Sequence, residues 1–261
     1  MTESNTAAMN GRKKKARFHE TWAFLVVFCI ILPIVFRTFA WSPFHIPSGS
    51  MKPTLLIGDY IFVSKFAAGY SRYSLPFGVP LIKGRIFEKP LQRGDIVVFR
   101  RPYDENASFW EKLFWPDFIK RLIGLPGDEI QMKNGVLFIN GRAVEKHCNS
   151  EFIDEEKGGK NITECTETLP EGLEYEVLDE LPNGPLDNTG IYKVPPKHYF
   201  FMGDNRDNSQ DSRVLSAVGY VPEENIVGRA DLIFFSARHS IFEPWNWPHL
   251  LRSDRFFKVT H

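Results

Sequence analysis

Two serines, Ser48 and Ser50, flank a glycine in the stretch HIPSGSMKPTL, residues 45–55. A serine hydroxyl becomes an effective nucleophile only when a base takes its proton. His45 is close in sequence, but its apolar neighbours on both sides favour a place in a strand over the role of a base. The stretch also lacks the Gly-x-Ser-x-Gly pattern of α/β-hydrolases. It therefore indicates either serine chemistry with a base elsewhere or a linker rich in Pro, Gly and Ser.

A second polar segment, GDNRDNSQDSR at 203–213, comes directly after the apolar run YFFM. An EF-hand is excluded, because counting from Asp207 puts Ser212 at position six and Val218 at position twelve, where Gly and Glu are required. The seven histidines show no His-x-x-x-His pair and no other spacing typical of zinc. We therefore expect no metal ion and no cofactor, and we expect these charges to have partners within the protein.

The segment that precedes the two serines is the most apolar of the chain: WAFLVVFCIILPIVFRTFAW, residues 22–41. As a helix it would reach roughly 30 Å, the thickness of the hydrocarbon core of a bilayer. Trp22 and Trp41 would lie at the two interfaces, and Arg37 would extend to the surface. The segment predicts a single transmembrane helix.

Five basic residues lie just before this segment, within RKKKAR at 12–17. Because positive charge stays on the cytoplasmic side, residues 1–20 are expected in the cytoplasm and the rest of the chain across the membrane. A cleavable signal peptide is the alternative, since Thr38 and Ala40 form a passable cleavage site. Arg37 interrupts the apolar region at that point and favours an uncleaved anchor.

The rest of the chain predicts a mainly β protein. Short runs rich in β-branched and aromatic residues recur between turn signals; they are residues 60–65, 95–99, 118–123, 129–132, 136–139, 199–202 and 230–235. They do not alternate with long helices. Asn134-Gly135 can supply the positive φ angles of a tight hairpin turn.

Composition divides the chain further. The region 141–196 is acidic and punctuated by Pro and Gly, which indicates an inserted cap domain within a β-rich core of residues 42–140 and 197–261. The predicted order is a basic tail (1–20), an anchor (21–41), and this interrupted core.

The charge and the cysteines add two constraints. The chain has 32 basic and 32 acidic side chains, so its zero net charge gives no sign of a nucleic-acid partner. Cys29 lies in the apolar segment, apart from Cys148 and Cys165 in the acidic insert. The insert is assigned to a side of the membrane that permits oxidation, so a disulfide and two free thiols both remain open.

Four motifs follow the apolar segment in a fixed order: PSGSMKPTL (47–55), RGDIVVF (93–99), KRLIGLPGD (120–128) and GDNRDNSQDSR (203–213). Together with the apolar segment they resemble the bacterial type I signal peptidases, or leader peptidases. These are membrane-bound serine proteases that use a serine and a lysine. The acidic insert matches no feature of that family that can be transferred.

The resemblance assigns roles residue by residue. It implies that Ser50 is the nucleophile, Lys120 the general base, Ser48 a donor to the oxyanion, and Ser209 a partner that orients the lysine. It also implies a second layer of three charged residues that stabilises the site: Asp204, Asp211 and Arg213.

The lysine must meet a physical condition, because an ordinary lysine with a pKa near 10.4 is protonated at neutral pH. Burial among apolar groups lowers the pKa of a lysine. In FIKRLIG, Lys120 shares one face of a predicted strand with Phe118 and Leu122. A lysine in a strand can equally lie at an exposed edge. Arg121 is no alternative base, and Lys52 is expected to be solvated.

The resemblance also implies substrates and location. The substrates would be preproteins with signal peptides, delivered by the export translocon and cut after small residues of the Ala-x-Ala type. The protein would be a monomer in the inner membrane, in contact with lipid and not with nucleic acid, with its catalytic region in the periplasm. The aromatic stretches 109–115 and 241–247 would lie at the membrane interface or pack in the core.

Three alternatives remain, two with the same serine and lysine chemistry and one from a different class. A mitochondrial inner-membrane processing peptidase shares the chemistry, but the complete GDNRDNSQDSR motif and the acidic insert look bacterial. A self-cleaving repressor would carry a DNA-binding helix-turn-helix in place of the anchor. An inactive membrane-bound binding module would lack the nucleophile or the base, and both are present.

Overall fold

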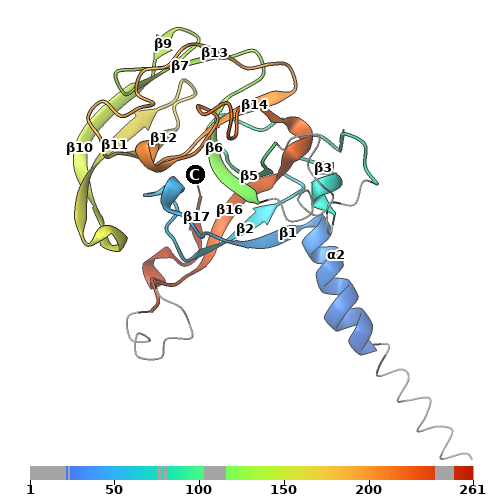
Figure 1. The fold of residues 1–261 in the computed structure, drawn as a ribbon. Coiled ribbons are helices and arrows are strands. Elements are labelled where there is room, and N and C mark those ends of the chain that lie inside the picture. The colour runs from blue at the N-terminus through green and yellow to red at the C-terminus, as the bar shows by residue number, and fades with distance from the viewer. Residues whose placement is uncertain are drawn as a thin grey trace, which may run out of the picture.

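A computed structural model gives the fold of the chain (Figure 1). It describes residues 22, 24–75, 78, 81–102, 116–238 and 250–260. The basic cluster at 12–17 and the aromatic stretches 109–115 and 241–247 lie outside the described residues, so the predictions made for them stay predictions.

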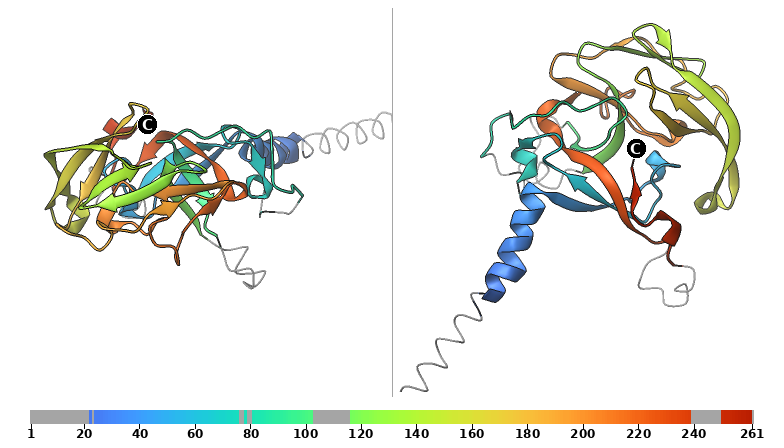
Figure 2. Two further views of the ribbon diagram at one scale, coloured as in Figure 1. Left: turned by 90° about the horizontal axis from the view of Figure 1, so that it is seen from above. Right: turned by 180° about the vertical axis from the view of Figure 1, so that it is seen from behind.

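The N-terminal apolar segment is helical and projects away from the strands in every view (Figures 1 and 2). It contains a π-helical turn η1 (Val27–Ile31) and helix α2 (Leu32–Phe39). Its large apolar side chains, from Trp22 to Phe39, are between 42% and 60% exposed. The helix ends at Phe39, and Trp41 already belongs to a strand.

Among the described residues, no helix combines the length and the apolar character that a membrane crossing requires. The transmembrane anchor stays a prediction.

The fold is mainly β, as predicted, and its largest sheet is antiparallel. The order of its strands is β1 (Trp41–His45), β2 (Asp59–Ser64), β16 (Ile226–Ser236), β5 (Ile96–Arg100), β6 (Asp117–Gly124), β14 (His198–Met202) and β15 (Val221–Pro222), with β17 (Lys258–Val259) paired to β16. These strands confirm five of the predicted runs, and β16 begins four residues earlier than expected. His45 is a strand residue, as its neighbours indicated.

Both faces of β5 are buried, which explains why its sequence is a continuous apolar run. Ile96 and Val98 pack in one apolar cluster with β2, whereas Val97 and Phe99 pack in another cluster on the opposite face. A strand that is buried on both faces needs apolar residues at every position. The next strand of the sheet, β6, is also central, because it lies between β5 and β14.

Smaller sheets pack beside the large one. A four-stranded sheet consists of β13 (Tyr192–Lys193), β7 (Glu129–Lys133), β8 (Val136–Ile139) and β9 (Arg142–Ala143), and a three-stranded sheet of β10 (Glu145–Asp154), β11 (Lys160–Thr168) and β12 (Glu174–Asp179). The pair β3 (Tyr70–Ser71) and β4 (Arg85–Ile86) completes the strands. The β7–β8 hairpin turns at Asn134 and Gly135, both with positive φ, which confirms the predicted turn.

The acidic region shares its core with the large sheet. One apolar cluster contains Cys165 and Val177 from the three-stranded sheet, Leu137 from β8, and Ile123 and Phe200 from the large sheet. The domain boundaries of the sequence analysis stay a prediction.

A disulfide joins Cys148 in β10 to Cys165 in β11. This answers the question that the sequence left open. Cys29 is a free, exposed cysteine of the N-terminal helical segment.

Close packing at the end of β6 yields a test of this arrangement. A Cβ atom on Gly124 would lie 2.9 Å from Phe200 Cβ and 3.0 Å from both Ile130 and Val194. We expect Gly124→Ala to lower the free energy of unfolding by about 1–3 kcal/mol, because the core has no room for the methyl group. Gly190→Ala is the matched control, since nothing lies within 4 Å of its added Cβ. Denaturant titration in detergent measures both, and a Gly124→Ala variant as stable as the control would contradict this packing.

Candidate active site

Ser50 lies in a short 3-10 turn, η2 (Gly49–Met51), between β1 and β2. The turn is held by Asn205, whose backbone N–H donates to the Ser50 carbonyl (3.1 Å) and whose side-chain amide donates to the Gly49 carbonyl (3.2 Å). Met51 within the turn is fully buried and anchors it in the apolar core. The turn that carries Ser50 is therefore fixed by the bonds from Asn205 to its backbone and by the packing of Met51.

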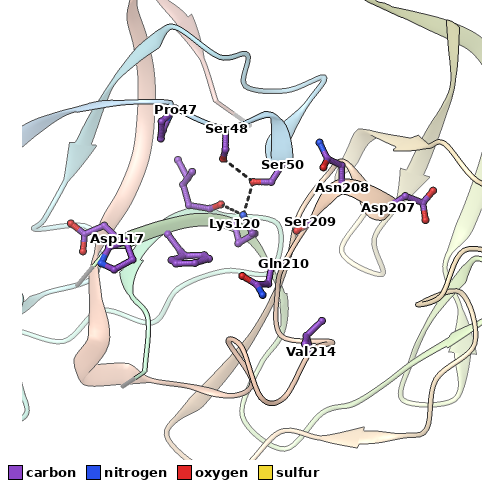
Figure 3. A pocket seen from close by; sticks show the side chains of 13 residues that line it. Pro47, Ser48, Ser50, Asp117, Lys120, Asp207, Asn208, Ser209, Gln210 and Val214 are labelled. Atoms are coloured by element: carbon purple, nitrogen blue, oxygen red, sulfur yellow. Dashed lines mark hydrogen bonds between the residues drawn. The ribbon is translucent and has the colours of Figure 1, made fainter. Parts of the chain in front are cut away.

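Lys120 on β6 reaches this turn. Its Nζ donates to Ser50 Oγ at 2.6 Å and to the Ile119 carbonyl at 3.0 Å. Ser48 Oγ lies 3.4 Å from Ser50 Oγ, and Figure 3 shows the three side chains converging on the pocket. The fold thus brings together a hydroxyl and an amine that are 70 residues apart in the chain.

Burial gives this lysine the property that a base requires. Lys120 is only 3% exposed, on a central strand, so the edge position considered from the sequence is wrong. Burial lowers the pKa of Lys120 to about 8, although Asp211 and Asp204 favour the charged form. A useful fraction of the amine is therefore neutral near physiological pH.

Asp211 and Arg213 form a buried pair within the 203–213 loop. Arg213 donates through Nε to Asp211 Oδ1 and through Nη2 to Oδ2, each at 2.9 Å. The Gly203 amide also donates to Asp211 (3.0 Å). Burial opposes the ionised carboxylate, but Arg213 and these hydrogen bonds lower the pKa of Asp211 below its usual value. The pair therefore stays charged and fixes the loop that lines the site.

Asp204 is paired with Arg121, the neighbour of Lys120 on β6. Arg121 donates from Nε at 2.8 Å and from Nη2 at 2.7 Å to the two Asp204 oxygens. Thr54, four residues after Ser50, donates to the same carboxylate at 2.6 Å. Since neighbouring strand residues point to opposite faces, β6 presents the base on one face and this ion pair on the other.

Ser209 lies in the same pocket, but its role stays a prediction. Its Oγ is buried without a hydrogen bond of normal geometry in the described part of the chain, and Lys120 donates to other groups. The space around it is very tight, because a Cβ on Gly203 would lie 2.2 Å from Ser209 Oγ and 2.5 Å from the Ser50 carbonyl oxygen. Only glycine at position 203 permits this approach.

The expectation for Lys52 is wrong. It is 4% exposed rather than solvated, and its Nζ lies 2.7 Å from both Asp154 Oδ1 and Glu156 Oε2. No local pattern indicates this contact, because the partners lie more than 100 residues away in the chain.

Two further residues escaped the sequence analysis. Asn205 and Arg206 lie within the motif, and Arg206 forms a bidentate pair with Glu167 of β11 at 2.7 and 2.5 Å. The sequence does predict that charges directly after an apolar strand have partners within the protein, and the pair of Arg206 with Glu167 is such a contact.

The pocket in front of Ser50 and Lys120 has a volume of about 640 Å³. Apolar side chains form part of its wall: Pro47, Pro116, Phe118, Ile119 and Val214. Within the described ranges, no group of three or more His, Cys, Asp or Glu side chains is arranged to hold a metal ion. A hydroxyl at the wall of a pocket can attack a carbonyl carbon when a neighbouring amine with a lowered pKa takes its proton.

Comparison with known proteins agrees with this chemistry. A family model described as signal peptidase, peptidase S26, matches residues 19–235. Signal peptidase I of Rickettsia typhi is 43% identical over 95% of this chain and 96% of its own, and that of Rickettsia prowazekii is 41% identical over the same shares. A crystal structure of a signal peptidase I from Enterococcus faecalis covers 54% of this chain and 97% of its own at 25% identity, with a TM-score of 0.29, which is too low to support an argument. Because the family match spans most of the chain and the Rickettsia relatives align along nearly its whole length, the chain belongs to the peptidase S26 family of signal peptidases, which are serine peptidases.

Proposed function

We propose that this protein is a membrane-bound endopeptidase that removes N-terminal signal peptides from exported preproteins through a Ser50/Lys120 dyad. The observation that carries the proposal is the 2.6 Å contact between Lys120 Nζ and Ser50 Oγ in a buried setting. Family membership supports the substrate class, and the geometry supports the choice of nucleophile and base.

In the first half of the reaction, neutral Lys120 takes the proton of Ser50 while Oγ attacks the scissile carbonyl carbon. The negative charge that develops on the carbonyl oxygen is stabilised by the Ser50 amide and the Ser48 hydroxyl. Collapse of the tetrahedral intermediate breaks the C–N bond, and protonated Lys120 donates its proton to the leaving amine. An ester between Ser50 and the signal peptide results, and Lys120 is neutral again.

In the second half, Lys120 removes a proton from a water molecule, which attacks the ester carbonyl. The intermediate collapses with loss of Ser50 Oγ, which takes the proton back from Lys120. The signal peptide leaves with a free carboxylate, and the resting dyad is restored. Asp204, Asp211 and Arg213 contribute by fixing β6 and the 203–213 loop through their buried ion pairs.

The specificity is part of the proposal. Cleavage after small residues of the Ala-x-Ala type rests on family membership, and the apolar side chains Phe118, Ile119 and Val214 offer suitable walls for small apolar side chains. No described residue of the pocket wall requires a charged residue at the cleavage site, because Asp117 and Asp207 already have protein partners.

The membrane anchor and the orientation also belong to the proposal. The exposed apolar side chains of η1 and α2 need a nonaqueous environment, and α2 leads directly into β1, which precedes the Ser50 turn. We place residues 1–20 in the cytoplasm, the helix in the inner membrane and the catalytic region in the periplasm. A signal segment in the same bilayer would then reach Ser50 without leaving the membrane surface. Preproteins from the export translocon and lipid are the partners, and the protein acts as a monomer.

Substitution of either member of the dyad tests the reaction. Ser50→Ala and Lys120→Arg should each lower the rate of preprotein cleavage at least about 10³-fold, because the first lacks the nucleophile and the second cannot lose its proton. The measurement is cleavage of a labelled preprotein by purified protein in detergent. Lys193→Met is the control, since Lys193 is exposed and pairs only at the surface with Glu129. Cleavage by Lys120→Arg near the wild-type rate would rule out this base.

The pH dependence follows from the pKa of Lys120. The neutral amine is the active form, so lowering the pH below about 8 protonates it and slows cleavage. We expect the rate to rise about tenfold for each pH unit below 8 and to level off above it. Initial rates between about pH 6 and pH 9 measure this limb. A rate that does not change over that range would contradict a lysine base.

Removal of the N-terminal segment tests the anchor. A chain that begins at Ala40 should no longer float with lipid vesicles, because it lacks the exposed apolar helix. It should retain cleavage in detergent within about tenfold, since every proposed catalytic group follows Pro47. Vesicle flotation and the preprotein assay measure the two effects separately. A shortened protein that still floats as the full chain does would argue against the anchor.

A further inference from the structure

Lys52, which has no part in the chemistry above, folds back over the turn that carries the nucleophile. Its backbone N–H donates to the Gly49 carbonyl at 3.2 Å and so closes the turn around Ser50. Its side chain then covers Gly49, because a Cβ placed on Gly49 would lie 3.1 Å from Lys52 Cε and 3.3 Å from Cδ. The stem of Lys52 therefore packs on the backbone next to the nucleophile.

The amine at the end of this stem is held by the tip of the β10–β11 hairpin, the curved arm at the left of Figure 1. Asp154 ends β10, and Glu156 lies in the 3-10 turn η5 (Glu155–Lys157) that follows. Lys52 Nζ donates to Asp154 Oδ1 and to Glu156 Oε2, both at 2.7 Å. Asp154 is 1% exposed, so this ion pair is buried.

The hairpin tip has a structure of its own. The Asp154 side chain accepts a hydrogen bond from the Glu156 amide (3.1 Å), and the Asp154 carbonyl accepts one from the Gly159 amide (2.9 Å). Gly158 adopts a left-handed conformation that ends the turn. The Asp154 carboxylate is therefore preorganised and gives Lys52 a fixed point to bind.

The hairpin is in turn fixed to the rest of the site. The Cys148–Cys165 disulfide joins its two strands, and Glu167 at the far end of β11 forms the bidentate pair with Arg206. Arg206 neighbours Asn205, which holds the Ser50 turn from the other side. The same hairpin thus stabilises both segments that hold Ser50.

We propose that Lys52 and Asp154, assisted by Glu156, are positioning residues that keep the Ser50 turn in register with Lys120. This inference rests on the proposed function, because Lys52 and Asp154 would act on the reaction of the Ser50/Lys120 dyad. It assigns a role to the β10–β11 hairpin of the acidic region, for which the family resemblance implies none.

The pKa values of the two buried lysines of the site are shifted in opposite directions for a physical reason. Burial disfavours the charge on Lys52, but its hydrogen bonds to Asp154 and Glu156 outweigh this effect and raise its pKa. Lys120 lacks such a carboxylate contact, and burial lowers its pKa to about 8. Lys52 therefore remains a cation, and its contacts persist, at the pH where Lys120 is neutral.

Kinetics of two variants and one matched control test the proposal. Lys52→Met keeps most of the stem but removes the charge, and Asp154→Asn weakens its buried partner. We expect each to lower kcat about 10- to 100-fold with KM changed less than about threefold, because a small displacement of a nucleophile is costly. Glu155→Gln is the control: it lies on the same turn, and its carboxylate pairs with Arg238 instead (3.7 Å), so it should behave as wild type.

A second measurement does not depend on activity. Loosening the turn should let water reach Lys120, so its pKa should rise toward the ordinary value in Lys52→Met. Titration of lysine labelled with carbon-13 at Cε, followed by NMR and assigned through Lys120→Arg, reports this pKa directly. The limb of the cleavage profile that rises with pH up to about 8 should move to higher pH by the same amount. A purely structural loss of stability would leave both unchanged in the folded protein.

The outcomes separate this inference from the proposed function. A folded Lys52→Met protein with wild-type kcat and an unchanged Lys120 titration would overturn the positioning role. If the wild type and Glu155→Gln fail to cleave preprotein while the titration still moves in Lys52→Met, the positioning inference stands and the peptidase function fails. If Lys52→Met does not fold, Glu156→Gln provides the same two readouts, with an expected loss of about three- to tenfold in kcat; no loss would count against the proposal.

Discussion

The candidate site depends on keeping one amine out of water. Lys120 can serve as a base only while it is buried, because contact with water would return its pKa toward that of a free lysine. A central strand with apolar neighbours on both sides provides this burial, and the Ser50 turn covers the amine at 2.6 Å. The order of the strands is therefore a condition of the chemistry as well as of stability.

Burial has two different results among three neighbouring cations. Lys120 meets only a hydroxyl and a carbonyl, so it tends toward its neutral form. Arg121 and Lys52 meet carboxylates at hydrogen-bond distance and remain charged. Buried ion pairs contribute little net stability because desolvation opposes their attraction, whereas loss of one partner is costly. These pairs are better understood as fixing the positions of β6 and of the Ser50 turn.

The region between β10 and β12 is part of this arrangement. It shares an apolar cluster with the large sheet and adds Glu167 and Asp154 to the network around the site. A segment of low apolar content can pack in this way because β11 and β12 bury some of their residues, such as Cys165 and Val177, and leave others to solvent, while β10 is mostly exposed. In the mechanism proposed here, the geometry of Ser50 and Lys120 thus depends on side chains from a part of the chain that carries none of the reacting groups.

Several features followed from the sequence because their causes are local. Apolar runs predicted β5, β6 and β14, and Asn134-Gly135 predicted a hairpin because only certain residues tolerate positive φ. The ordered motifs, which include Ser50 and Lys120, predicted the family before any geometry was known.

Other features depend on contacts between distant segments, which the tertiary structure decides. The meeting of Ser50 with Lys120, the Cys148–Cys165 disulfide and the burial of Lys52 all require a specific strand order and register. Lys52 was misjudged because a lysine beside a turn is normally solvated, and the carboxylates that bury it lie more than 100 residues away. Backbone conformation is set largely by neighbouring residues, but burial and pKa are set by whatever the fold packs against a side chain, and no local pattern specifies that.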